Sequence, residues 1–306
     1  MATERYNSAM SVKYQVWKLR RDGVTQRYWV APTREHDDAV IAVVSDDLAT
    51  AESRREQELA RQLLQSPSVQ ELLYRSLVQK YEETNSSDLE PMSFLQHYLS
   101  RGYPEAESLL LRLAAEPSNR HVRRAAVLTI ALSMDSRAPR LIREVIDKAT
   151  DERTRSFAII DLANYLNNTM RNLMTQGIAS TREAILGALE TLGLALQDKW
   201  GRLEGEIDYI LDALNYKRSE FEKAAHGQIP DSIEKTLVDG LVSALSSGDL
   251  TNEAFKQMLG VVEKWGSEYA LSKLRSLWSG LSSKRRRDMV FDAMNEIEHQ
   301  LKRKSG

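Results

Sequence analysis

The sequence predicts a mainly α-helical fold, in which an array of paired helices follows a small N-terminal β-hairpin or three-stranded element. Apolar residues recur at i, i+3 and i+4 from residue 46 onward, which is the spacing of amphipathic helices. The second helices of two helix pairs in the middle of the chain match each other at an offset of 32 residues. The β element is predicted from one stretch near the start that is rich in Val, Tyr and Trp. The predicted domains are residues 1–45, 46–168 and 169–306.

The stretch Val12–Ala31 predicts a β-hairpin. Its two strands flank Arg20-Arg21-Asp22-Gly23, and Asp-Gly favours a tight turn because glycine accepts a positive φ. Pro32 ends the second strand, since proline has no N–H to donate to a neighbouring strand. Ala39–Ser45 is expected to add a third strand, because an isolated hairpin is only marginally stable in water.

Hydrophobic spacing and capping residues predict about a dozen helices in the remainder of the chain. Gly187 and Gly193 lie inside one of these helices and are expected to mark close helix packing, and Thr251 and Ser282 or Ser283 are expected to cap two others. The predicted helices are Asp47–Gln65, Ser68–Glu83, Met92–Arg101, Glu105–Ala115, Arg120–Met134, Arg137–Ala149, Glu152–Asn168, Arg182–Trp200, Gly205–Ala225, Asp231–Leu245, Ala254–Trp265, Ser267–Trp278 and Ser283–Lys302.

The repeat is clearest between Arg120–Met134 and Glu152–Asn168. Arg123 matches Arg155, and several apolar positions of the two helices match at the same offset. The matched apolar positions are Ala126 with Ala158, Val127-Leu128 with Ile159-Ile160, and Ile130-Ala131 with Leu162-Ala163. Over about residues 103–168 the chain therefore resembles HEAT and armadillo repeats, which stack antiparallel helix pairs. The resemblance implies a stack whose inner helices line a concave face. It also extends to HEAT-fold DNA glycosylases, which cradle DNA in such a face, although no motif in this chain fixes that activity.

Charge is distributed unevenly along the chain. Residues 1–34 hold seven basic and two acidic side chains, a balance of +5. The whole chain carries −2, so the remaining 272 residues carry −7. In the hairpin, basic residues alternate with aromatic rings that stack on bases, which is typical of a nucleic-acid contact. The predicted binding residues are Lys13, Lys18, Arg20, Arg21, Arg27, Tyr28 and Trp29. Alternatively, half of the rings pack on the body and the cations keep an exposed edge soluble.

Two further basic groups are candidates for a secondary patch. The first comprises Arg120, Arg123, Arg124 and Arg155, which repeat early in the matched helices, and the second is the run Lys284, Arg285, Arg286 and Arg287. Alternatively, the first group is solvated or pairs with acids such as Glu116 and Asp151. The second group begins a predicted helix, where the helix dipole disfavours cations, and this favours a bound anion. Alternatively, the run is a solvated patch.

The sequence predicts no catalytic residue, metal ligand or cofactor. The chain has no cysteine, which excludes disulfides, thiolate metal sites and a cysteine nucleophile. It also lacks the phosphate-binding, nucleophile-elbow and zinc-protease motifs, and its five histidines are scattered. No run approaches the roughly 18 apolar residues of a membrane span, and we expect a cytoplasmic protein without a membrane partner.

Three functional hypotheses follow. The first is a non-enzymatic binder of RNA or a ribonucleoprotein, with the ribosome as a candidate partner and a stress, hibernation or assembly factor as the matching role. The second is a protein–protein scaffold or homodimerising adaptor that uses the hairpin for strand addition. The third is a HEAT-type enzyme acting on DNA, such as a DNA glycosylase.

Overall fold

The structure is a computed structural model. It describes residues 64–176, 181–199, 203, 205–247 and 250–305, together with the backbone of four short strands within residues 1–45. These strands are β1 (Thr3–Glu4), β2 (Tyr14–Arg21), β3 (Thr25–Pro32) and β4 (Ala42–Ser45), paired antiparallel in that order. The side chains of these strands lie outside the described residues, and so does most of the predicted helix Asp47–Gln65.

The chain forms two compact units, residues 1–135 and residues 136–306. The helices of the first unit are α2 (Pro67–Thr84), the short 3-10 helix η1 (Glu90–Met92), α3 (Ser93–Ser100), α4 (Pro104–Ala114) and α5 (Arg120–Leu132). Helices α2 and α4 begin with proline, whose fixed φ and missing N–H suit the first helical position. Helix α4 packs along α5, and both α2 and α3 contact this pair.

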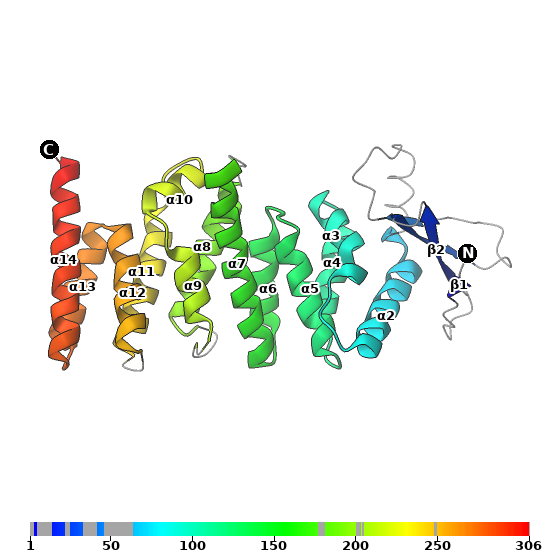
Figure 1. Cartoon of the computed structure of the whole chain (residues 1–306), viewed down its shortest axis with the longest axis horizontal. Helices are drawn as coiled ribbons and strands as arrows, with labels where there is room; N and C mark the ends of the chain where they lie inside the picture. Colours follow the sequence, from blue (N-terminus) through cyan, green and yellow to red (C-terminus); the bar gives the residue numbers. More distant parts are fainter. Residues whose placement is uncertain are drawn as a thin grey trace. The chain divides into compact units, whose positions relative to one another are not determined.

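The second unit contains the remaining nine described helices. They are α6 (Ala138–Lys148), α7 (Glu152–Gln176), α8 (Arg182–Leu196), α9 (Ile207–Leu214), α10 (Arg218–Ala224), α11 (Asp231–Ser246), α12 (Asn252–Trp265), α13 (Glu268–Gly280) and α14 (Lys284–Ser305). Figure 1 shows successive helices of this unit lying side by side along the chain order. The expected helix caps are present, since Thr251 Oγ1 accepts from Ala254 N at 3.1 Å and Ser283 Oγ from Arg286 N at 3.4 Å.

The second unit is built as two layers of helices. Helix α6 contacts α8, α8 contacts α11, and α11 contacts α13, which gives one layer. The other layer runs from α7 to α9, then to α12 and α14. Helix α10 is added between pairs and touches α7 and α8. The repeating unit is therefore an antiparallel helix pair with one member in each layer, which is compatible with a helical repeat fold.

The 32-residue repeat is visible in burial and in capping. From Val122 to Leu132, the order of buried, half-buried and exposed side chains recurs at residues 154–164, with Phe157 as the single exception. The caps also correspond: Asn119 Oδ1 accepts from His121 N at 2.8 Å, and Asp151 Oδ1 accepts from Thr154 N at 2.8 Å. The two helices start at equivalent positions because equivalent polar side chains satisfy their first N–H groups.

Glycine sets the closest approach of two helices in the second unit. A Cβ on Gly193 of α8 would lie 3.0 Å from the backbone N and Cα of Leu237 in α11. A Cβ on Gly240 of α11 would lie 2.4 Å from Gly193 O. Gly193 therefore marks close packing as expected. Gly187 does not, because its Cβ would make only an ordinary 3.6 Å contact with Pro139 Cβ.

The predicted mainly helical fold is confirmed for the described residues, but one predicted helix is divided. The range Gly205–Ala225 forms α9 and α10, with a break at residues 215–217. Groups from other helices hold this break: Lys264 Nζ donates to Asn215 O at 3.0 Å, and Tyr216 Oη donates to Asn167 Oδ1 at 2.9 Å. In addition, α7 continues past Asn168 to Gln176. The division into domains 1–45, 46–168 and 169–306 stays a prediction.

Candidate functional site

The predicted primary contact lies in the N-terminal hairpin, and its side chains fall outside the described residues. These residues are Lys13, Lys18, Arg20, Arg21, Arg27, Tyr28 and Trp29. The strand register places Lys18 opposite Tyr28 and Leu19 opposite Arg27 in the backbone pairing of β2 and β3. The binding roles of these side chains stay predictions.

The arginine that repeats in α5 and α7 contacts its own helix pair. Arg123 Nη1 donates to Glu116 O at 2.7 Å and to Pro117 O at 3.2 Å, in the turn that precedes α5. Arg155 Nη1 donates to Ala149 O at 3.0 Å, in the equivalent turn before α7. Both arginines are half-buried, and their guanidinium groups donate to backbone carbonyls of the turns between helices. These two members of the predicted secondary patch therefore support the fold of each pair.

The other members of this patch differ in exposure. Arg120 is exposed, and its Nε donates to His121 Nε2 at 3.2 Å, whereas Arg124 is half-buried. These side chains belong to α5, in the first unit, whereas Arg155 belongs to the second unit. The expected stripe of cations on a shared concave face stays a prediction.

The basic run at the start of α14 is divided between half-buried and exposed side chains. Arg286 donates to Leu250 O, and its guanidinium group lies 4.9 Å from the centre of the Phe255 ring. Lys284 and Arg285 are exposed, and Arg287 is half-buried. Arg286 therefore anchors α14 to α12, and the exposed charge of the run is carried by its neighbours.

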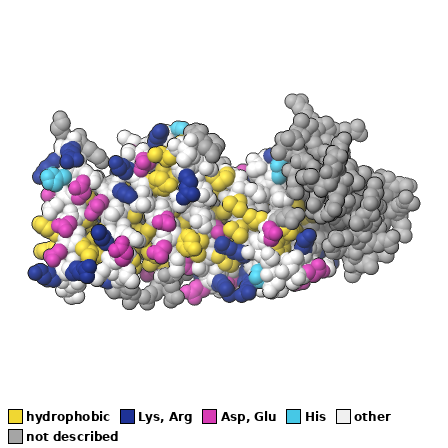
Figure 2. All heavy atoms as spheres, viewed as in Figure 1, with side chains coloured by type: hydrophobic (Ala, Val, Ile, Leu, Met, Phe, Trp, Pro, Cys, Tyr) yellow, Lys and Arg dark blue, Asp and Glu magenta, His cyan; other side chains and the backbone are white. Residues whose placement is uncertain are grey.

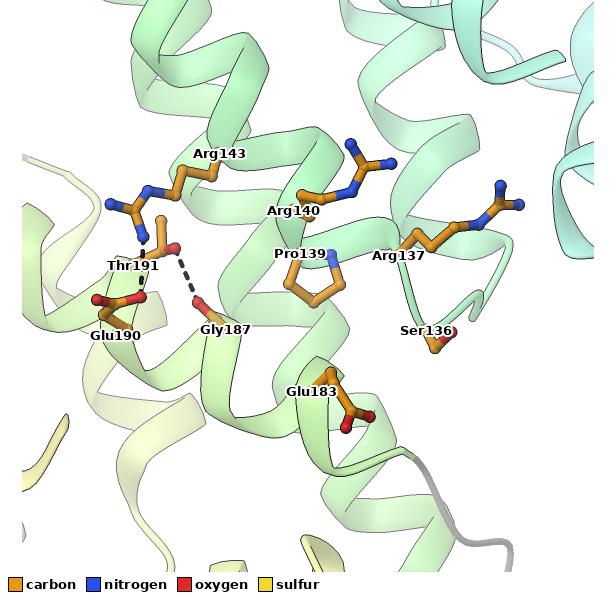
Figure 3. A pocket seen from close by; sticks show the side chains of 9 residues that line it. All are labelled: Ser136, Arg137, Pro139, Arg140, Arg143, Glu183, Gly187, Glu190 and Thr191. Carbon is orange, nitrogen blue, oxygen red and sulfur yellow. Dashed lines mark hydrogen bonds and ion pairs between the residues drawn. The ribbon is translucent and has the colours of Figure 1, made fainter. Parts of the chain in front are cut away.

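A groove between α6 and α8 is a further candidate site, which Figure 3 shows from close by. Its volume is about 410 Å³. Helix α6 and the turn before it provide one wall, and α8 provides the other. The lining residues are Ser136, Arg137, Pro139, Arg140, Arg143, Glu183, Gly187, Glu190 and Thr191.

Charge in this groove is mixed. Arg143 Nη1 bonds Glu190 Oε2 at 2.9 Å, and Arg143 Nε lies 3.9 Å from Asp147 Oδ2. The guanidinium groups of Arg137 and Arg140 point away from Gly187 in Figure 3. Thr191 Oγ1 donates to Gly187 O at 2.8 Å, so this hydroxyl group is occupied by its own helix. The groove offers polar contacts to a ligand rather than a nucleophile with an adjacent base.

The sequence prediction did not include this groove. A signal was present, because Arg137, Arg140 and Arg143 recur every three residues and so share one side of a helix. The carboxylates that face them come from α8, about 45 residues later, and no local pattern connects the two helices.

His97 of α3 is a half-buried titratable group away from the groove. Burial lowers the pKa of His97, and its Nε2 is buried without a hydrogen-bond partner. The neighbouring ring of Tyr98 lies edge-on to it, with centroids 5.8 Å apart. Within the described part of the chain, no group of three or more His, Asp and Glu side chains is placed to hold a metal ion.

No protein-family model matches the chain, and the search of curated proteins gives no match either. None of the described helices combines the length and the apolar character needed to cross a membrane.

Proposed function

We propose that this chain is a non-enzymatic RNA- or ribonucleoprotein-binding protein, in which the N-terminal hairpin makes the contact and the helical array is its scaffold. One observation carries the proposal: residues 1–34 have a charge of +5 and four aromatic rings between positions 14 and 29, in a chain whose remainder carries −7. Cations beside stacking rings suit single-stranded RNA.

The helical repeat gives indirect support. The two repeating arginines, Arg123 and Arg155, donate to carbonyls of their own turns. They are therefore committed to the fold, and the proposal rests on the five cations of the hairpin, Lys13, Lys18, Arg20, Arg21 and Arg27. An acidic body that carries a basic arm suits a mixed surface of RNA and basic protein, such as a ribosome, better than free nucleic acid.

The experiment compares the full-length chain with a variant in which Lys18, Arg20, Arg21 and Arg27 are replaced by Ala. Binding to a fluorescein-labelled single-stranded oligouridine is measured by anisotropy, and binding to purified ribosomes by co-sedimentation. The proposal expects the variant to lose binding in at least one assay while its circular dichroism is unchanged. Equal binding by both proteins in both assays refutes it.

A specific observation favours a protein–protein scaffold or homodimer as the second candidate. Met174 of α7 is 52% exposed and Tyr209 of α9 is 46% exposed, and these helices pack against each other in one layer. Large apolar side chains on neighbouring helices are typical of protein contacts. Sedimentation over a range of concentrations tests the homodimer: a dimer that dissociates when both residues are replaced by Ser supports it, and a monomer at all concentrations excludes it.

A further inference from the structure

The last helix pair exposes two aromatic rings beside a basic turn. Trp278 of α13 is 42% exposed and Phe291 of α14 is 51% exposed. They are the only Trp and Phe side chains this exposed among the described residues. Large aromatic side chains are normally buried. Two half-exposed rings on adjoining helices therefore indicate a surface that a ligand can cover.

A run of four basic residues, 284–287, directly follows the turn between these helices. Residues 251–306 contain eleven basic and seven acidic side chains, a balance of +4 in a chain of net −2. Lys284 and Arg285 follow the turn directly and are exposed, whereas Arg286 turns inward to Leu250 O. In Figure 2, Lys and Arg side chains gather at the lower end of α14, where this helix begins.

Helix geometry relates the rings to the cations. Lys284 and Phe291 are seven residues apart, about two turns, and therefore share one face of α14. Trp278 precedes Lys284 by six residues across the turn. Asp288 lies on the same face of α14 and reduces the positive potential there, but Lys284 and Arg285 are both exposed at the start of the helix.

We propose that Trp278, Phe291, Lys284 and Arg285 form a second contact for single-stranded RNA on the helical array. The rings stack on bases, and the two cations meet the phosphates on either side. This inference rests on the proposed RNA-binding function and adds a site to it. RNA suits the surface better than a protein partner does, because two exposed cations lie between the two exposed rings along the chain and a polyanion with π faces satisfies both.

The test uses full-length protein and a labelled single-stranded oligouridine. Trp278→Ala is expected to weaken binding by about fivefold or more, the lower end of one base–ring stack. Lys284→Ala with Arg285→Ala is expected to reduce the slope of log K against log salt by roughly 1.4, since each phosphate contact on a single strand contributes about 0.7. These substitutions should not unfold α14, because cations are disfavoured at a helix N-terminus.

The matched control is Lys223→Ala with Lys256→Ala, which removes two exposed cations from other helices of the same unit. The control is expected to leave the salt slope unchanged. If the hairpin variant loses RNA binding while the Trp278 and Lys284/Arg285 variants behave like the control, the second site is refuted and the proposed function stands. If the full-length protein does not bind the oligouridine, the second site is refuted, and ribosome co-sedimentation then decides the proposed function.

Discussion

The crossing of α8 and α11 gives a sharp test of how this array packs. In Gly240→Ala, the new Cβ would lie 2.4 Å from Gly193 O and 2.8 Å from Leu196 Cβ. A backbone carbonyl inside a helix cannot move aside as a flexible side chain can, so the two helices must separate. Leu192 and Leu241, both fully buried in these helices, would then lose contacts with their neighbours.

Two effects of opposite sign decide the magnitude. Alanine is favoured over glycine inside a helix by about 1 kcal/mol. Overpacking a well-packed core costs about 1–3 kcal/mol, and a rigid backbone contact belongs at the upper end of that range. The expected net result for Gly240→Ala is a loss of about 1–2 kcal/mol in the free energy of unfolding. For a unit of this size, that loss lowers Tm by roughly 2–8 °C.

Gly260→Ala is the matched control, because Gly260 lies inside α12 and a Cβ there would meet nothing within 4 Å. Only the higher helix propensity of alanine acts at this position, so Gly260→Ala should raise the free energy of unfolding by about 0.5–1 kcal/mol. Urea unfolding followed by far-ultraviolet circular dichroism compares both variants with the parent. If Gly240→Ala is as stable as Gly260→Ala, the close backbone crossing is not present and the reasoning fails.

Three further predictions concern the polar contacts of the array. Arg155→Gln removes the donor to Ala149 O and should lower the urea midpoint by the equivalent of about 1 kcal/mol in the free energy of unfolding. An unchanged midpoint would show that this hydrogen bond does not stabilise the fold. The hydrogen bond from Arg112 lowers the pKa of Glu71 below the ordinary 4.5. The ionised carboxylate therefore stabilises the fold at pH values above 4.5. This stabilisation is lost as the pH falls through the lowered pKa of the folded state. Glu71→Gln should therefore lower the free energy of unfolding by about 0.2–1 kcal/mol at neutral pH, and its stability should fall less steeply in acid than that of the parent. Equal dependence of stability on pH in the two proteins would contradict this. Burial raises the pKa of Glu263, so its effect on stability has the opposite sign to that of Glu71. Ionising this carboxyl group costs stability as the pH rises above 4.5. Glu263→Gln should therefore raise Tm at neutral pH but not in acid.

Much of the helical array follows from local sequence. The structure has α5 at Arg120–Leu132 and α7 starting at Glu152, where the sequence predicts Arg120–Met134 and a start at Glu152. The reason is local, because the caps Asn119 and Asp151 bond N–H groups only two or three residues away. Hydrophobic spacing within one helix and a polar cap before it are sufficient to place such elements.

Features that depend on distant residues were not predictable. The break between α9 and α10 depends on Lys264, which bonds Asn215 from 49 residues away. The groove between α6 and α8 depends on the pairing of Arg143 with Glu190, which are 47 residues apart. Likewise, the sequence showed four adjacent cations in α14, but only tertiary packing distinguishes Arg286, bonded to Leu250 O, from the exposed Lys284 and Arg285.

The salt dependence of RNA binding tests the central proposal most directly. Affinity for the labelled oligouridine is measured between roughly 50 and 200 mM salt for the parent and for the variant in which Lys18, Arg20, Arg21 and Arg27 are replaced by Ala. The proposal predicts weaker binding and a slope smaller by about 2–3, since each lost phosphate contact removes about 0.7. Unchanged affinity and slope would contradict a role for the hairpin in binding RNA.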